Sequence, residues 1–281
     1  MNFVLEPLVR ILPLWLRKEI AAEQLAQTSE LRLRIGQAVE IVCITGSYWL
    51  RQKVTEEDLK FCINMASKYS PWTASTMNEG FITIEGGHRI GISCCWLLEE
   101  SGRCSIQKMT SLCIRIAKDY RSISRDLYLI HESILILGRP GSGKTTLLRD
   151  LVREISNHRK GSICVVDERK ELFPMNGNTM CFCPGPRTDV LSGYPKGKGV
   201  EMAIRCLSPK VVAIDEITAA EDCTALIEAS WCGVDILATA HASSVDDLFK
   251  RPVYKPLLEC GLFRICVVMN EDKSWILERI K

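Results

Sequence analysis

The sequence predicts an α/β protein: a domain with a mainly parallel sheet, preceded by a smaller α+β domain. Between residues 31 and 117, apolar residues recur mostly with period two, which is typical of strands with one buried face. Beyond residue 129, short runs of branched apolar residues alternate with helical patterns, as in a parallel sheet covered by helices. A glycine-rich segment, GRPGSGKT at 138–145, stands between one such run and a helical pattern.

The composition is that of an ordinary globular protein of 281 residues, 25% charged and 47% hydrophobic. Lys and Arg number 36 against 34 Asp and Glu, so a formal charge of +2 gives no whole-molecule field that would gather nucleic acid or anionic lipid. The 14 cysteines include no C-x-x-C, which predicts reduced thiols in a cytoplasmic protein. Charged residues and prolines interrupt the apolar stretch 3–16, so we expect neither a signal peptide nor a membrane span.

The smaller domain is expected over residues 1–120. Residues 31–35 alternate between apolar residues and arginines, which predicts a strand. Gly86-Gly87 stands between two alternating segments and accepts the positive φ angles of a tight hairpin turn. Thr55 and Asp58 resemble a capping box before a run with helical period.

A polar segment, residues 121–128, is expected to link this domain to a second one over residues 129–281. The second domain is predicted to contain strands buried on both faces. They are expected at the apolar runs 133–137, 163–166, 211–214, 236–238 and 265–269.

The glycine-rich segment satisfies the phosphate-loop pattern G-x-x-x-x-G-K-[ST] and lies between a strand and a helix N-terminus, as that pattern requires. Its backbone N–H groups and the helix end suit a phosphate, Lys144 reaches the β and γ oxygens, and Thr145 can hold Mg²⁺. ATP and Mg²⁺ are therefore the expected cofactors. The predicted nucleotide-binding residues are Gly138, Arg139, Pro140, Gly141, Ser142, Gly143, Lys144, Thr145 and Thr146.

The apolar run 211–214 ends in Asp215-Glu216, at the sheet edge that carries the phosphate loop. Asp215 is predicted to act at Mg²⁺ together with Thr145, and Glu216 to point toward the attacking water. The alternative is a strand end with two solvated acids.

A second acidic group follows the run 163–166: Asp167-Glu168, with Glu171 close behind. It is predicted to position water or metal, with Asp167 as a further metal ligand; the alternative is an ordinary exposed turn. An extra strand inserted between the phosphate-loop strand and the Asp215 strand is what a resemblance to RecA-like ATPases implies.

His241 follows the predicted strand 234–239 at the same sheet edge and is a candidate sensor of the γ-phosphate, or else a structural histidine. Residues 183–199 contain many Pro and Gly and are predicted to form a loop or lid. The cations of this region are either a solvated basic set or include an arginine finger that completes a neighbouring subunit's site. They are Arg187, Lys196, Lys198 and Arg205, with the two arginines as the candidate fingers.

Several segments, in order, resemble the secretion-type ATPases of type II and type IV systems and pilus motors: GRPGSGKTTLLRD, VVDERKE, GPRTDVL, AIRCLSP, DEI and TAHA. With LRLRIGQAVEI and GFITIEGGHRIGI in the first domain, they resemble more closely the stage III sporulation protein AA family of endospore-forming bacteria. The resemblance covers nearly the whole chain. It implies a RecA-like P-loop ATPase domain and a first domain that packs on the neighbouring subunit of a homo-oligomeric ring, expected to be hexameric. It also implies a mother-cell cytoplasmic location, peripheral at the membrane through partners, and service to a membrane-embedded channel complex linking mother cell and forespore.

The resemblance assigns Lys144 and Thr145 to the phosphate-loop pair, Asp215-Glu216 to the acidic pair, Asp167, Glu168 and Glu171 to the acidic box, and His241 to the His box. Secretion motors commonly have Gly-Glu where this chain has Asp-Glu, and they often use an acidic-box Glu to activate water. Which of Glu168, Glu171 and Glu216 is the base stays open. Arg205 stands four residues before Pro209 where the motors' arginine stands three before, a shift that turns a helical side chain by about 100°.

The expected function is a Mg²⁺-dependent ATPase of the secretion-motor type. One alternative is a nucleic-acid translocase of the RecA-like class, which the near-neutral charge and the lack of an aromatic-interleaved basic tract in the first domain disfavour; no nucleic-acid partner is expected. The other is a nucleotide-responsive scaffold with little turnover, which the intact acidic residues disfavour.

Overall fold

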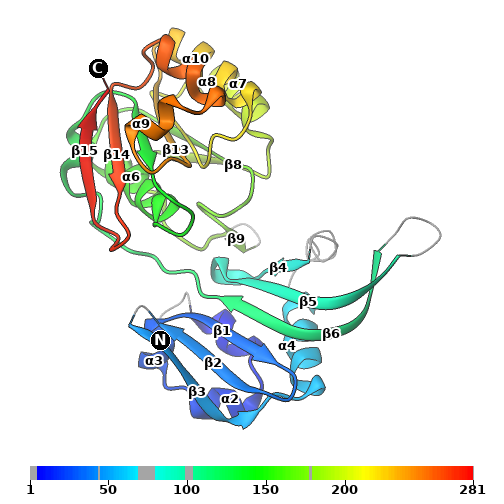
Figure 1. Ribbon diagram of the computed structural model, residues 1–281. Coiled ribbons are helices and arrows are strands. Elements are labelled where there is room, and N and C mark those ends of the chain that lie inside the picture. Colours follow the sequence, from blue (N-terminus) through cyan, green and yellow to red (C-terminus); the bar gives the residue numbers. More distant parts are fainter. Residues whose placement is uncertain (1–4, 44, 69–79, 99–103, 177–178, 281) are drawn as a thin grey trace. The chain divides into compact units, whose positions relative to one another are not determined.

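The computed structural model describes residues 5–43, 45–68, 80–98, 104–176 and 179–280, and the chain divides into two compact units (Figure 1). The first unit comprises Met1–Lys118 and Met175–Cys181, and the second comprises Asp119–Pro174 and Phe182–Lys281. No helix in the described part of the chain is long and apolar enough to cross a membrane.

The first unit is a six-stranded antiparallel sheet with helices packed on one face. Its helices are α1 (Glu6–Ile11), α2 (Leu14–Glu19), α3 (Ala22–Gln27), α4 (Glu56–Lys68) and the 3₁₀ turn η1 (Glu85–Gly87). Its strands follow the order β3-β2-β1-β6-β5-β4. They are β1 (Thr28–Arg34), β2 (Ala38–Cys43), β3 (Gly46–Lys53), β4 (Phe81–Thr83), β5 (Arg89–Leu98) and β6 (Cys104–Arg115).

The predicted elements of this unit are present. Leu31 and Leu33 of β1 are fully buried beneath the helices, so the alternating pattern marks the inner face of the strand. Thr55 caps α4 as predicted: its N–H donates to Asp58 Oδ2 at 2.8 Å, and the Asp58 N–H donates to Thr55 Oγ1 at 3.2 Å.

The predicted hairpin turn at Gly86-Gly87 contacts a short segment that lies far along the sequence. Both glycines have positive φ, +81° and +76°, as the turn requires. The Gly86 N–H points at Cys181 Sγ, 3.1 Å away. Cys181 follows a small hairpin, β9 (Met175–Asn176) and β10 (Thr179–Met180), which the sequence places in the second domain and the structure groups with the first unit.

The second unit is a seven-stranded sheet in the order β11-β8-β12-β13-β7-β14-β15, parallel except for β15. Its strands are β7 (Ile134–Leu137), β8 (Ile163–Asp167), β11 (Thr188–Ser192), β12 (Val211–Ile214), β13 (Asp235–Ala240), β14 (Ile265–Met269) and β15 (Trp275–Arg279). Its helices are η2 (Arg125–Leu129), α6 (Lys144–His158), α7 (Lys196–Leu207), α8 (Ala220–Trp231), α9 (Val245–Phe249), η3 (Pro252–Tyr254) and α10 (Lys255–Glu259).

Helices cover both faces of this sheet. One set of alternate strand residues, such as Leu135 and Leu137, packs with apolar side chains of α7, α8 and α10, which group together in Figure 1. Leu147, Leu151 and other buried residues of α6 contribute the remaining helical cover. All five predicted strands are buried as expected for a doubly covered parallel sheet.

The strand order confirms the expected extra strand between the phosphate-loop strand β7 and the Asp215 strand β12: it is β13. The strand that carries the second acidic group, β8, lies instead on the far side of β12. A strand that lies between two others along the chain need not lie between them in the sheet, because the crossover helices determine its place.

The segment 183–199, predicted to be a loop or lid, instead contains the edge strand β11 and the start of α7. Its prolines stand outside the strand, and Pro195 is the N-cap residue of α7, where its missing N–H costs nothing. Gly199 is needed in α7 because a Cβ there would lie 2.4 Å from Val166 Cγ1 on β8. The glycines therefore permit close packing of a helix on the sheet.

The segment 121–128, predicted to be a linker, lies within the second unit and is held there by α6. Asp150 is fully buried and accepts hydrogen bonds from the N–H groups of Ser122 (2.9 Å) and Ser124 (2.8 Å) and from the Ser124 hydroxyl (2.7 Å). One turn later, Arg153 pairs with Asp119. This segment is polar because its serines donate hydrogen bonds to the buried Asp150 carboxylate, and not because it is a solvated linker.

We expect Asp150→Ala to lower the free energy of unfolding of the second unit by about 3 kcal/mol, because the change leaves buried donors without their acceptor. Urea denaturation measures this difference. Glu228→Ala, at an exposed position of α8, is the control and should change the same quantity by less than about 0.5 kcal/mol. Equal effects of the two substitutions would contradict the anchoring role.

Candidate nucleotide-binding site

The predicted phosphate loop connects β7 to α6. Gly141 and Gly143 have φ of +73° and +102°, conformations that other residues rarely adopt. A Cβ added at Gly138 would lie 2.4 Å from Ser142 Oγ and 2.9 Å from Met269 Cβ. The loop therefore closes tightly at a helix N-terminus, where free N–H groups and the helix dipole favour an anion.

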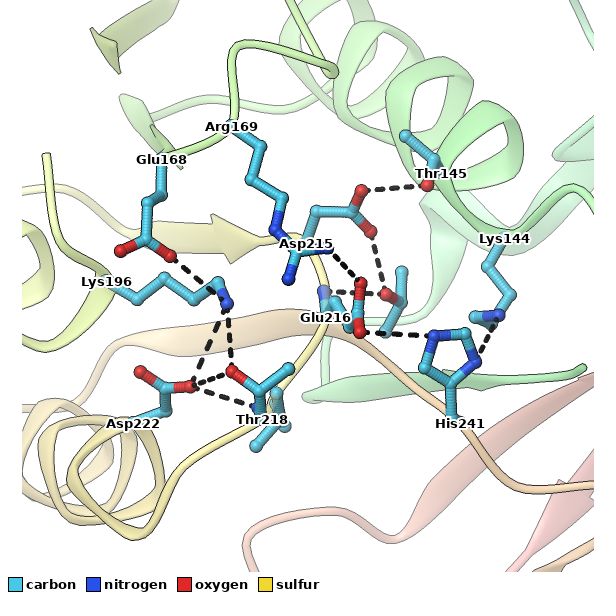
Figure 2. A network of polar contacts seen from close by, with 12 residues as sticks. Lys144, Thr145, Glu168, Arg169, Lys196, Asp215, Glu216, Thr218, Asp222 and His241 are labelled. Atoms are coloured by element: carbon cyan, nitrogen blue, oxygen red, sulfur yellow. Dashed lines mark hydrogen bonds and ion pairs between the residues drawn. The ribbon is translucent and has the colours of Figure 1, made fainter. Parts of the chain in front are cut away.

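Lys144 is buried, and its ammonium lies inside the loop. Nζ donates to the carbonyl oxygens of Gly138 (2.9 Å) and Arg139 (3.0 Å) and lies 3.2 Å from His241 Nδ1 (Figure 2). Burial lowers the pKa of Lys144, and two nearby carboxylates oppose that shift. The ammonium thus contacts both the loop and the predicted sensor histidine.

Thr145 and Asp215, both predicted metal ligands, lie in direct contact. The Thr145 hydroxyl donates to Asp215 Oδ2 at 2.8 Å (Figure 2), and the Thr239 hydroxyl of β13 donates to Oδ1 at 2.7 Å. Asp215 comes directly after β12, the neighbour of β13 in the sheet, so the topology explains this convergence. A hydroxyl and a carboxylate oxygen are donor types that suit Mg²⁺ beside a phosphate.

Glu216 is held on both of its carboxylate oxygens. Oε1 lies 3.2 Å from His241 Nε2, and Oε2 lies 2.9 Å from Arg169 Nη1 (Figure 2). Its backbone has a φ of +55°, unusual for a residue other than glycine, and its N–H donates to Thr239 Oγ1 at 2.8 Å. Lys144, His241, Glu216 and Arg169 therefore form a continuous polar chain.

Asp167, predicted to bind metal, lies in the turn after β8 and shapes it. Oδ1 accepts a hydrogen bond from the Glu171 N–H at 2.9 Å, and Oδ2 accepts one from the Phe173 N–H at 2.8 Å. Burial raises the pKa of this carboxyl, against the effect of those backbone donors. These contacts give the predicted metal role of Asp167 no geometric support.

Glu168 points toward Lys196, away from the phosphate loop (Figure 2). Its Oε2 lies 3.3 Å from Lys196 Nζ, and the lysine is almost fully buried. The same Nζ lies 3.3 Å from Thr218 Oγ1 and 3.9 Å from Asp222 Oδ2. Of the acids that the sequence left open, Glu168 is thus engaged by a buried lysine, whereas Glu216 belongs to the polar chain that reaches Lys144.

Arg149, which the sequence analysis missed, fixes the turn after β8 against α6. Its Nε donates to the Leu172 carbonyl at 2.6 Å and its Nη2 to the Glu171 carbonyl at 2.7 Å, and the guanidinium lies 4.3 Å from the centre of the Phe182 ring. Burial lowers the pKa of this arginine. Its place four residues after Thr145, on the same face of α6, is the signal that could have found it. Glu171 is held here through its backbone.

Arg187 and Arg205, the candidate fingers, lie away from this chain's own loop. Arg187 precedes β11 at the amino edge of the parallel sheet, and its guanidinium donates to the Ser156 carbonyl of α6 at 2.8 Å. Arg205 lies in the last turn of α7, pairs with Glu201 at 2.7 Å and is 74% exposed. The phosphate loop lies at the opposite, carboxyl edge, so a finger role for either arginine would concern a second copy.

The loop fits a bound triphosphate with Mg²⁺. Ser142 Oγ is buried in the loop without a hydrogen-bond partner among the described residues, and such an atom is unusual in a folded protein. A phosphate oxygen would satisfy it. Arg139 at the loop's outer side pairs with Glu271 at 3.0 Å, and both side chains are exposed.

Residues 5–277 match the family described as sporulation stage III, protein AA. Stage III sporulation protein AA of Bacillus subtilis (strain 168) is 36% identical over 266 residues, covering 91% of this chain and 87% of that protein.

Two solved structures resemble the whole fold. The ATPase DotB of Legionella pneumophila has a TM-score of 0.63 at 18% identity, covering 96% of this chain and 80% of that chain. The pilus retraction motor PilT, solved with bound ADP, has a TM-score of 0.62 at 13% identity, covering 91% and 79%. These likenesses confirm the predicted fold class, an α/β RecA-like domain with a mainly parallel sheet preceded by a smaller α+β domain. The chain belongs to the sporulation stage III, protein AA family.

Proposed function

We propose that this chain is a Mg²⁺-dependent ATP hydrolase. The observation that supports it most is the 2.8 Å contact between Thr145 and Asp215, which brings a hydroxyl and a carboxylate together at the mouth of a glycine-rich loop. The buried ammonium of Lys144 lies in the same loop. This arrangement suits a triphosphate with its metal ion.

In the proposed reaction the loop N–H groups and Lys144 bind the β- and γ-phosphates, while Thr145 and Asp215 hold Mg²⁺. The bound ion would neutralise charge on the phosphates. Glu216 orients the attacking water and accepts its proton, and His241 holds one oxygen of that carboxylate. Catalysis would then come mainly from positioning and electrostatics.

Lys144 is the residue that would link binding to chemistry. Its ammonium contacts two loop carbonyls and His241. Phosphate oxygens would replace those partners, which releases His241 from Lys144 while His241 keeps its contact with Glu216. The γ-phosphate would thus be sensed through the polar chain.

We further propose that the hydrolase is a secretion-type motor that energises a channel complex between mother cell and forespore. Family membership ties the chain to sporulation, and the two similar structures are called an ATPase and a pilus retraction motor. The proposed assembly is a homo-oligomeric, hexameric ring in the mother-cell cytoplasm, held at the membrane by membrane-embedded channel proteins. Arg187 and Arg205 are proposed to complete the site of the neighbouring copy.

Steady-state phosphate release over a range of protein concentrations tests this function. We expect release that requires Mg²⁺, stops with a chelator, and rises in specific activity with concentration because arginines act between copies. Background release at every concentration would contradict the hydrolase and favour a scaffold. Salt-sensitive stimulation by single-stranded nucleic acid would instead favour a translocase.

A further inference from the structure

Arg169 has no role in the site that the sequence predicts, yet it touches a carboxylate at the centre of that site. We propose that Arg169 is a positioning residue that orients the Glu216 carboxylate for water activation. The proposal rests on the proposed ATP hydrolase function and deepens it. It assigns Arg169 a role through Glu216, with no contact to the nucleotide.

The geometry of Glu216 supports this role. The terminal torsion of a glutamate is soft and roughly two-fold, so one contact leaves the plane of the carboxylate free to turn. Here His241 holds one oxygen at 3.2 Å and Arg169 holds the other at 2.9 Å (Figure 2). Because these partners come from different strands' ends, β13 and β8, the two contacts fix both the position and the plane of the group.

The turn that carries Arg169 is itself well held. The Asp167 carboxylate accepts hydrogen bonds from the N–H groups of Glu171 and Phe173, and the Asp167 carbonyl accepts one from the Lys170 N–H at 3.3 Å. Arg149 holds the far end of the turn by the Leu172 carbonyl. A guanidinium on such a turn approaches Glu216 from a fixed base, which is what positioning requires.

Folding stability does not explain the pair. Arg169 is 55% exposed and Glu216 is 24% exposed, and ion pairs that water reaches to this extent contribute little to the free energy of unfolding. Misplacing a reacting group, by contrast, can cost about 100-fold in rate. The pair therefore matters for the reaction far more than for the fold, and the two effects can be measured apart.

The test compares Arg169→Met, Arg169→Lys and wild type in the full chain with ATP and Mg²⁺. We expect Arg169→Met to lower kcat about 10- to 100-fold and Arg169→Lys to recover part of that loss. The Kd for ATP, measured by calorimetry, should stay within about twofold, and the melting temperature within about 2 °C. Arg251→Met is the matched control, because it also removes an exposed arginine from an ion pair: Arg251 lies 3.1 Å from Asp247 of α9. It should keep the wild-type kcat.

A double variant with Glu216→Gln gives a second measurement. If Arg169 acts through Glu216, adding Arg169→Met to Glu216→Gln should produce almost no further loss, because the two residues act as a unit. Independent, multiplicative losses would overturn the proposal.

Two other results would also overturn it. One is a wild-type kcat in Arg169→Met, and the other is a Kd for ATP weakened tenfold or more, which would place Arg169 on the nucleotide. Both leave the hydrolase assignment intact. Failure of that assignment appears separately, as absence of Mg²⁺-dependent turnover in the wild-type chain.

Discussion

Lys144→Ala should abolish measurable ATP hydrolysis, a loss of about 1,000-fold or more in kcat/KM. The ammonium is the charged donor of the phosphate loop, and the structure buries it there against two loop carbonyls. Alanine removes the buried charge that would stabilise the β- and γ-phosphates. A phosphate-release assay at saturating Mg²⁺ measures the loss.

Lys255→Ala is the control for that experiment, because Lys255 is a 70% exposed lysine on α10 that pairs with Glu259. We expect it to retain wild-type activity. Hydrolysis by Lys144→Ala at the wild-type rate would remove the assignment of this loop as the site of the reaction.

Glu216→Gln should lower kcat by about 100- to 1,000-fold while the chain still binds ATP. The amide keeps the shape of the side chain and its contact with Thr239 through the backbone, but it cannot accept a proton from water. Bound ATP should therefore accumulate without turnover. Single-turnover hydrolysis, with nucleotide affinity measured in parallel, separates the chemical step from binding.

Glu168→Gln distinguishes the two acidic groups. Its carboxylate faces Lys196, so we expect a loss in kcat of less than about tenfold. An inactive Glu168→Gln beside an active Glu216→Gln would reverse the assignment and place the base in the turn after β8.

The central residues of the site could be predicted from the sequence because each of them follows directly after a buried strand. The apolar runs before Gly138, Asp215 and His241 become neighbouring parallel strands, whose carboxyl ends meet at one sheet edge. The contacts of Lys144 with His241 and of Thr145 with Asp215 then follow from topology. A local pattern was enough because each strand is short and continuous.

Other features of the fold and the site could not be predicted from the sequence, because they depend on packing between residues far apart along the chain. Segment 183–199 reads as a loop because its prolines and glycines break periodicity, yet the glycine at 199 is there to let α7 approach β8. The sequence assigned no role to Arg169 or Arg149, because the groups they contact, Glu216 and the Leu172 carbonyl, lie elsewhere along the chain. The segment Met175–Cys181 belongs to the first unit, where Cys181 contacts the Gly86 N–H. No sequence pattern predicts this contact, because the two residues are far apart along the chain.

Calorimetric titration of ATP with Mg²⁺ into the wild-type chain and into Lys144→Ala tests most directly whether a triphosphate binds at the loop between β7 and α6. We predict saturable binding with one site per chain in the wild type and no detectable binding in the variant. Equal uptake by both chains, or no uptake by the wild type, would contradict the account.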